Sequence, residues 1–189
     1  MAAARASRAM GQEAVAYLLR NGVTEAAVAA AFSLCGDKDA CQSLPTQRQV
    51  ASVAAFLRAE CGLADADVAK ALNRSPRVLL LELASMRQKV VLLGKWLKAP
   101  GELAAAVVAF PALLCLKRNE CRESLQYLKS DAGLSHRQMK HCLISHPEVL
   151  GYAHKMKARP DAEMRTEQPG DGRRCVRACV GISAHLEDE

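Results

Sequence analysis

The chain has 189 residues, half of them hydrophobic and only 4% aromatic, which suffices for one domain with a buried core. Ala and Leu dominate while β-branched residues are scarce, so the composition favours helices over sheets. No apolar run reaches the roughly 18 residues that a membrane span needs. The net charge of +6 lies in residues 47–150, which hold 15 basic and 9 acidic side chains. This local excess indicates an anionic partner, although a solvated basic face would also explain it.

The first eleven residues allow two interpretations. They contain Arg5, Arg8, Ser7 and several alanines, and no acidic residue occurs before Glu13. This composition is typical of a remnant of an organelle transit peptide, and equally of the start of an Ala-rich helix. Both alternatives remain open for residues 1–11.

Residues 12–152 contain an internal repeat. The segment 53–79 aligns without gaps on 124–150, an offset of 71 residues that corresponds to two units. Pro111 lies 35 residues after Pro76 and 36 before Pro147, so it marks a third unit between them. An earlier unit is degenerate, with Gly36 at the proline position. We therefore predict four units. The matched positions include Phe56-Leu57, Trp96-Leu97 and Tyr127-Leu128, and also Gly22-Val23, Gly62-Leu63 and Gly133-Leu134.

Each unit is predicted to hold two helices and a short turn. In the second unit, apolar residues at i, i+3, i+4 and i+7 indicate a first helix over Gln49–Cys61, which Gly62 ends in a left-handed turn. A second helix is expected over Asp65–Arg74, with Asp65, and Ser135 in the last unit, as N-caps. The proline stops this helix, and the apolar residues after it make one tight turn that fills the gap between units. Units of this size must stack, so the fold class is an all-α solenoid.

Cysteines and the C-terminal residues give little indication of a metal site. Cys61, Cys115, Cys121 and Cys142 lie in apolar helical patterns, where a thiol acts as a small buried hydrophobe. After Tyr152 the repeat ends, and residues 153–189 are predicted to be a polar, disordered tail. The tail contains Cys175, Cys179 and His185, but their spacing matches no standard zinc pattern. We expect neither a metal nor another cofactor.

Two segments carry a resemblance to a known family. Ser-Pro-Arg-Val-Leu-Leu at 75–80 and His-Pro-Glu-Val-Leu-Gly at 146–151, each after a second helix, resemble the motif of the mitochondrial transcription termination factor (mTERF) family. The resemblance covers about residues 12–152. It implies a superhelix that works in mitochondria or chloroplasts and binds double-stranded DNA, or in some cases structured RNA or ribosomal partners. With only four units, the chain would have a short footprint on nucleic acid.

Phosphate contacts require Lys or Arg on one continuous face, and equivalent positions of a solenoid share a face. Arg87 and Arg122 both lie eleven residues after a proline, and Arg48 is one position off that register. These three form the best predicted stripe. Further candidates close to it, or on the second helices, are Lys89, Lys117, Arg118, Lys70, Arg74, Arg137 and Lys140. For Arg74, compensation of the helix dipole is an equal alternative.

The remaining motifs favour binding over catalysis. Trp96 and Tyr127 occupy repeat positions that we interpret as packing positions, and the histidines form no ligand cluster. No phosphate-binding Gly-rich loop, nucleophile elbow or His-Glu-x-x-His motif occurs, so we expect no enzymatic activity. The leading hypothesis is a monomeric, organellar protein that binds nucleic acid, double-stranded DNA in preference to RNA, and regulates transcription termination or gene expression. The alternative is a helical-repeat module for protein interaction or assembly, associated with RNA or the ribosome.

Overall fold

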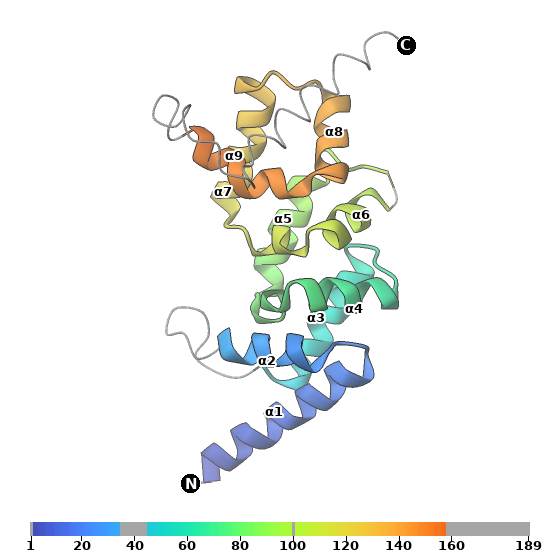
Figure 1. The fold of residues 1–189 in the computed structure, drawn as a ribbon, viewed down its shortest axis with the longest axis vertical. Helices are drawn as coiled ribbons and strands as arrows, with labels where there is room; N and C mark the ends of the chain where they lie inside the picture. The colour runs from blue at the N-terminus through green and yellow to red at the C-terminus, as the bar shows by residue number, and fades with distance from the viewer. Residues whose placement is uncertain (1, 35–44, 100, 158–189) are drawn as a thin grey trace.

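The computed structural model describes residues 2–34, 45–99 and 101–157, with side chains described between 11 and 153. Within these residues every regular element is a helix, so the predicted all-α class is confirmed. Figure 1 shows the helices stacked one after another along the long axis of the molecule. The α-helices are α1 (Ala2–Arg20), α2 (Glu25–Leu34), α3 (Gln47–Ala59), α4 (Asp65–Arg74), α5 (Leu83–Leu93), α6 (Glu102–Ala109), α7 (Arg118–Gln126), α8 (His136–Ser145) and α9 (Leu150–Lys157). The shorter elements are the 3₁₀ turns η1 (Pro76–Leu80), η2 (Pro111–Cys115) and η4 (Pro147–Val149), and the π-helical segment η3 (Tyr127–Asp131).

The helices form two layers. In one layer α1, α3, α5, α7 and α9 contact each other in succession, and in the other α2, α4, α6 and α8 do so. Each consecutive pair of α-helices from α1 to α8 is one unit, so the described residues hold the four predicted units, followed by α9. This arrangement confirms the helical-repeat fold. We call the odd-numbered helices the first-helix layer.

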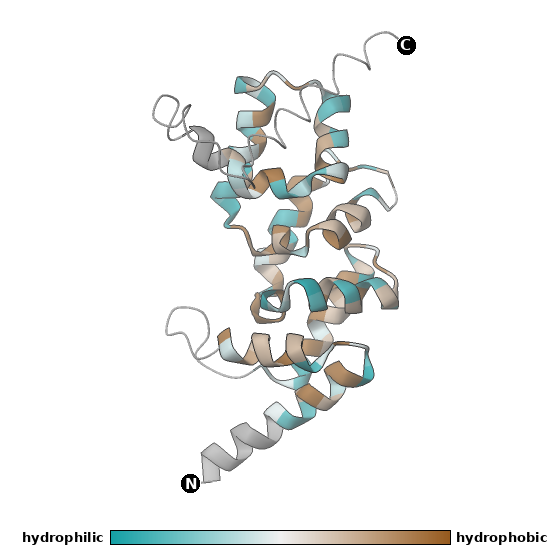
Figure 2. Cartoon of the chain, viewed as in Figure 1, coloured by the Kyte–Doolittle hydropathy of each residue, from teal (hydrophilic) through white to brown (hydrophobic). Residues whose placement is uncertain are grey.

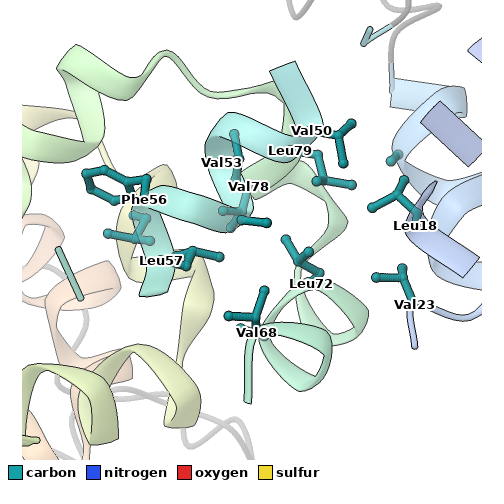
Figure 3. Close-up of a cluster of buried hydrophobic side chains, with 14 of the residues drawn as sticks. Leu18, Val23, Val50, Val53, Phe56, Leu57, Val68, Leu72, Val78 and Leu79 are labelled. Carbon is teal, nitrogen blue, oxygen red and sulfur yellow. The ribbon is translucent and has the colours of Figure 1, made fainter. Parts of the chain in front are cut away.

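The three proline-initiated turns hold the units together. Pro76, Pro111 and Pro147 each begin a 3₁₀ turn, as predicted, and the residue three positions later is fully buried in each case. These buried residues are Leu79, Leu114 and Leu150. Figure 3 shows Leu79 and Val78 among side chains from α1, α3 and α4 in the first of two core clusters. The turn therefore fills the space between layers that the two helices of a unit leave open.

Of the predicted glycine turn and N-caps between the two helices of a unit, the structure confirms some and contradicts one. Gly62 has φ +74°, and the N–H of Leu63 donates to the carbonyl of Leu57 at 3.1 Å, which closes α3. Ser135 is the N-cap of α8 and accepts from the N–H of Gln138. The prediction that Asp65 caps α4 is wrong.

Ala64 adopts the extended N-cap conformation, and Asp65 is the first helical residue. Its carboxylate pairs with Arg58 of α3 across the loop at 2.5 Å instead of accepting from the helix backbone. A negative charge in this first turn still stabilises the helix dipole.

Element boundaries depart from the predictions at two places. The helix expected at Gln49–Cys61 is α3, Gln47–Ala59, because Thr46 caps it by accepting from the N–H of Gln49. The boundary predicted after residue 152 falls inside α9, which packs against α7, so the helical domain continues to at least residue 157. Residues 1–11 belong almost entirely to α1, as the helical interpretation expected. The predicted tail beyond 157 and the predicted Gly36 position lie outside the described residues.

Candidate nucleic-acid interface

The predicted stripe lies on the first-helix layer. Arg87 in α5 and Arg122 in α7 each follow a core residue with 0% exposure, Met86 and Cys121 respectively. Both arginines are exposed, and they stand at equivalent positions of α5 and α7, which pack against each other in successive units. Arg48 is also exposed. It lies in the first turn of α3, the helix that precedes α5 in this layer. The structure thus brings the three arginines onto adjacent helices.

The arginines of this layer differ in their partners. The Nε of Arg87 donates to Glu60 at 2.7 Å, and both side chains are partly exposed, so the pair is worth only about 0–1 kcal/mol. Within the described part of the chain, the side chains of Arg48, Arg118 and Arg122 have no ion pair or hydrogen bond. Arg118 lies one turn before Arg122 on α7, a helix that Figure 2 shows as predominantly hydrophilic. These cations are available to an anionic ligand.

The prediction that Lys89 contacts phosphate is wrong. Its side chain is 2% exposed, and its ammonium group donates to the carbonyl of Leu114 at 2.7 Å and to the hydroxyl of Ser85 at 3.0 Å. Burial lowers the pKa of this lysine. An ammonium group held inside the protein by a backbone carbonyl cannot reach a ligand outside it.

Lys89 occupies a repeat position with a structural role. Ser124 lies at the same distance after its preceding proline, 13 residues in both cases, and donates to the carbonyl of Leu150 at 2.8 Å. In both units a polar side chain of the first helix therefore bonds the backbone of the proline turn. The burial of Lys89 could have been predicted from the sequence, since this residue lies three positions after Met86 and four before Leu93, on the core stripe of α5.

Most of the predicted phosphate-binding residues outside the stripe form ion pairs or hydrogen bonds within the protein. Lys70 pairs with Asp67 at 2.9 Å, and Lys117 with Glu120 at 3.8 Å. Lys140 of α8 forms an ion pair with Glu102 of α6, and hydrogen bonding from the lysine lowers the pKa of the Glu102 carboxyl. Among the predicted residues on the second helices, Arg137 is exposed at the start of α8 and has no ion pair within the described residues.

The sequence allowed two roles for Arg74, a phosphate contact and compensation of its own helix dipole, and the structure shows a different one. Its guanidinium donates to the carbonyls of Val108 and Ala109, at 2.9 and 3.1 Å. These carbonyls end α6, so the arginine caps the C-terminus of a helix in the next unit and not that of its own helix. The side chain links two units and is not directed at a ligand.

The aromatic residues that we predicted to pack in the core, Trp96 and Tyr127, are only partly buried. Leu97 and Leu128 are buried, whereas Trp96 and Tyr127 beside them are partly buried against the second core cluster. The ring of Trp96 also stacks on His136, with centroids 5.1 Å apart. The repeat pattern does not reveal this contact, because the two residues belong to different units.

The described cysteines behave as hydrophobic residues. Cys61, Cys121 and Cys142 are buried, and Cys115 is partly buried. Burial raises the pKa of the Cys61 thiol to about 12 and that of Cys121 to about 11, so neither is a thiolate at neutral pH. In the described ranges no three His, Cys, Asp or Glu residues gather as a metal site would require. Cys175, Cys179 and His185 fall outside those ranges.

Comparison with known proteins identifies the family. The mTERF family model matches residues 4–168, which covers the whole helical repeat and begins inside the segment 1–11. A search of curated proteins finds no significant match. Among the helices described, none combines the length and apolar character needed to cross a bilayer. The chain belongs to the mTERF family, a family of organellar nucleic-acid-binding proteins with roles in transcription.

Proposed function

We propose that this protein binds double-stranded DNA through its first-helix layer and regulates transcription termination or gene expression in mitochondria or chloroplasts. The observation that carries the proposal is the set of exposed arginines on adjacent first helices. Arg48, Arg118 and Arg122 have no ion pair within the described residues, and Arg87 has only a weak one. Family membership supports nucleic acid as the ligand class.

The spacing of the helices suits a duplex. Packed helices lie about 8–10 Å apart, which is close to three base-pair steps of about 3.4 Å. Arginines at equivalent positions of α5 and α7 can therefore follow phosphates along one strand. Phosphate contacts fix the position of a protein on DNA but do not read its sequence, so we expect these arginines to provide affinity with little sequence preference.

The test is the salt dependence of binding to a mixed-sequence duplex, measured with the full chain. Four phosphate contacts predict a slope of about −3 to −4 for the logarithm of the association constant against that of salt concentration. Arg122→Gln is expected to reduce the size of this slope by about 1. Arg77→Gln removes the same charge from an exposed residue of the turn η1, outside the first-helix layer, and is the matched control. It should leave the slope unchanged.

Several results would contradict the proposal. These are no duplex binding at low salt, an affinity independent of salt, or an Arg122→Gln slope equal to that of the unsubstituted chain. Retention of a protein partner after nuclease treatment, together with no affinity for a duplex, would favour the interaction module instead.

A further inference from the structure

A second group of basic side chains lies at the other end of the first helices, where units three and four turn from their first to their second helix. Its centre is Trp96, which follows α5. The ring of Trp96 stacks on His136 of α8 with an interplanar angle of 28°, and the ammonium group of Lys129 lies 5.8 Å from the centroid of the indole ring. The loop after α5 and the segment η3 with the start of α8 bring these residues together. We define the loop-edge cluster as these three residues together with the exposed cations beside them in the sequence, which are Lys95, Lys98 and Arg137.

The charges of this cluster are not neutralised internally. Its four Lys and Arg side chains are exposed and form no ion pair within the described residues. Two acidic residues belong to the same loops, Asp131 and Glu102, and the Glu102 carboxylate is already paired with Lys140 and bonded to the N–H of Ala99. The equivalent loop of the second unit is different, because Arg58 there pairs with Asp65. The unpaired positive charge therefore belongs to units three and four and is not a general feature of the repeat.

The aromatic pair is not explained by packing alone. Trp96 is only partly buried, and His136, which covers it, is exposed. A buried leucine, Leu97 or Leu128, occupies the adjacent core position in each of these units. Exposed rings flanked by cations are the feature that proteins use to hold unpaired bases, because every base has a π-face and every nucleotide has a phosphate.

We infer that the loop-edge cluster binds an unpaired nucleotide segment, with a base stacking on the His136–Trp96 pair and with Lys95, Lys98 and Arg137 near its phosphates. Lys129 strengthens the site by placing a cation over the indole ring. The inference adds a single-stranded ligand to the proposed duplex function. A duplex offers its phosphates to such a site but keeps its bases stacked, and an acidic peptide offers charge without planar bases. The combination of rings and cations therefore favours a single strand.

Trp96 provides a direct readout because the chain contains a single tryptophan. Its fluorescence is titrated with a single-stranded DNA oligonucleotide, the RNA of the same sequence, an abasic DNA strand of the same length and an acidic peptide of equal charge. The base-containing strands should quench the fluorescence and bind tightly, and comparison of the DNA with the RNA identifies the preferred source of the bases. The abasic strand and the peptide should bind more weakly without quenching.

Variants separate stacking from charge. His136→Ala should weaken binding of the base-containing strand about 5- to 150-fold, the range expected for loss of one base-stacking contact. Lys129→Ala should have a smaller effect in the same direction. Arg77→Gln, in η1, removes an exposed positive charge outside both groups and should leave the quenching intact.

Equal binding of the abasic and base-containing strands, absence of quenching, or an unchanged affinity in His136→Ala would overturn the inference. Tight binding of the acidic peptide with quenching would assign the cluster to a protein partner. The two proposals fail separately, because His136→Ala is expected to preserve the salt slope on duplex DNA, whereas Arg122→Gln is expected to preserve quenching by the single strand.

Discussion

Substitution of Lys89 tests the packing and the proposed interface together. Lys89→Met removes the ammonium group but keeps a stem of similar length, whereas Lys89→Ala also removes the stem beyond Cβ. Both variants leave the Leu114 carbonyl without its lysine donor, and both remove a buried charge. These two contributions cancel when the variants are compared with each other.

The difference between the two variants can be worked out from burial. The side chain of Lys89 is 2% exposed, so the three stem groups that Ala lacks are all inside the protein. At about 0.8 kcal/mol for each buried methylene, the free energy of unfolding of Lys89→Ala should be about 2–3 kcal/mol below that of Lys89→Met. Urea unfolding followed by circular dichroism at neutral pH measures this difference.

The pH dependence has a definite sign. Burial lowers the pKa of Lys89 below its ordinary value of 10.5, so the folded protein binds the proton more weakly than the unfolded chain does. Relative to Lys89→Met, the unsubstituted chain should therefore gain stability as pH rises through the window between the lowered pKa and 10.5, and lose it as pH falls.

The same variants examine the interface. Lys89→Met should leave the salt slope for duplex DNA unchanged, although it removes the same charge as Arg122→Gln. Equal stability of Lys89→Ala and Lys89→Met would refute the buried position of this side chain. A salt slope reduced by about 1 in Lys89→Met would show that Lys89 does contact phosphate.

Three further substitutions test the repeat. Leu114→Ala should lower the free energy of unfolding by about 2–5 kcal/mol in urea, because Leu114 is fully buried in η2, and a loss below 1 kcal/mol would contradict this packing. Gly62→Ala should cost about 1–2 kcal/mol because its φ is +74°, whereas the control Gly151→Ala, inside α9, should be neutral or stabilising. Glu102→Gln should flatten the acid dependence of thermal stability. The Glu102 pKa is lowered by Lys140, so its contribution is present above the ordinary pKa of 4.5 and lost as pH falls through the lowered value; parallel melting profiles from pH 7 to 3 would contradict this.

The prolines show why so much of the fold was predictable. Pro76, Pro111 and Pro147 each stop a helix through steric effects on their immediate neighbours, and Gly62 permits a left-handed turn at one residue. Signals of this kind act within a few residues, so they can be recognised in the sequence without knowledge of the packing. The stacking of units then follows, since no unit can bury its apolar face alone.

Local spacing by itself predicted the all-α class, the four units and the proline turns, and it put Arg87 and Arg122 at equivalent positions of successive first helices. Only the tertiary structure decided which cations remain available. Lys89 bonds a carbonyl 25 residues away, and Arg74 bonds carbonyls 34 and 35 residues away. Such partners become neighbours only when units stack and layers close. The energy of a charged side chain depends on the groups that packing brings within a few ångströms, and spacing along the chain does not specify them.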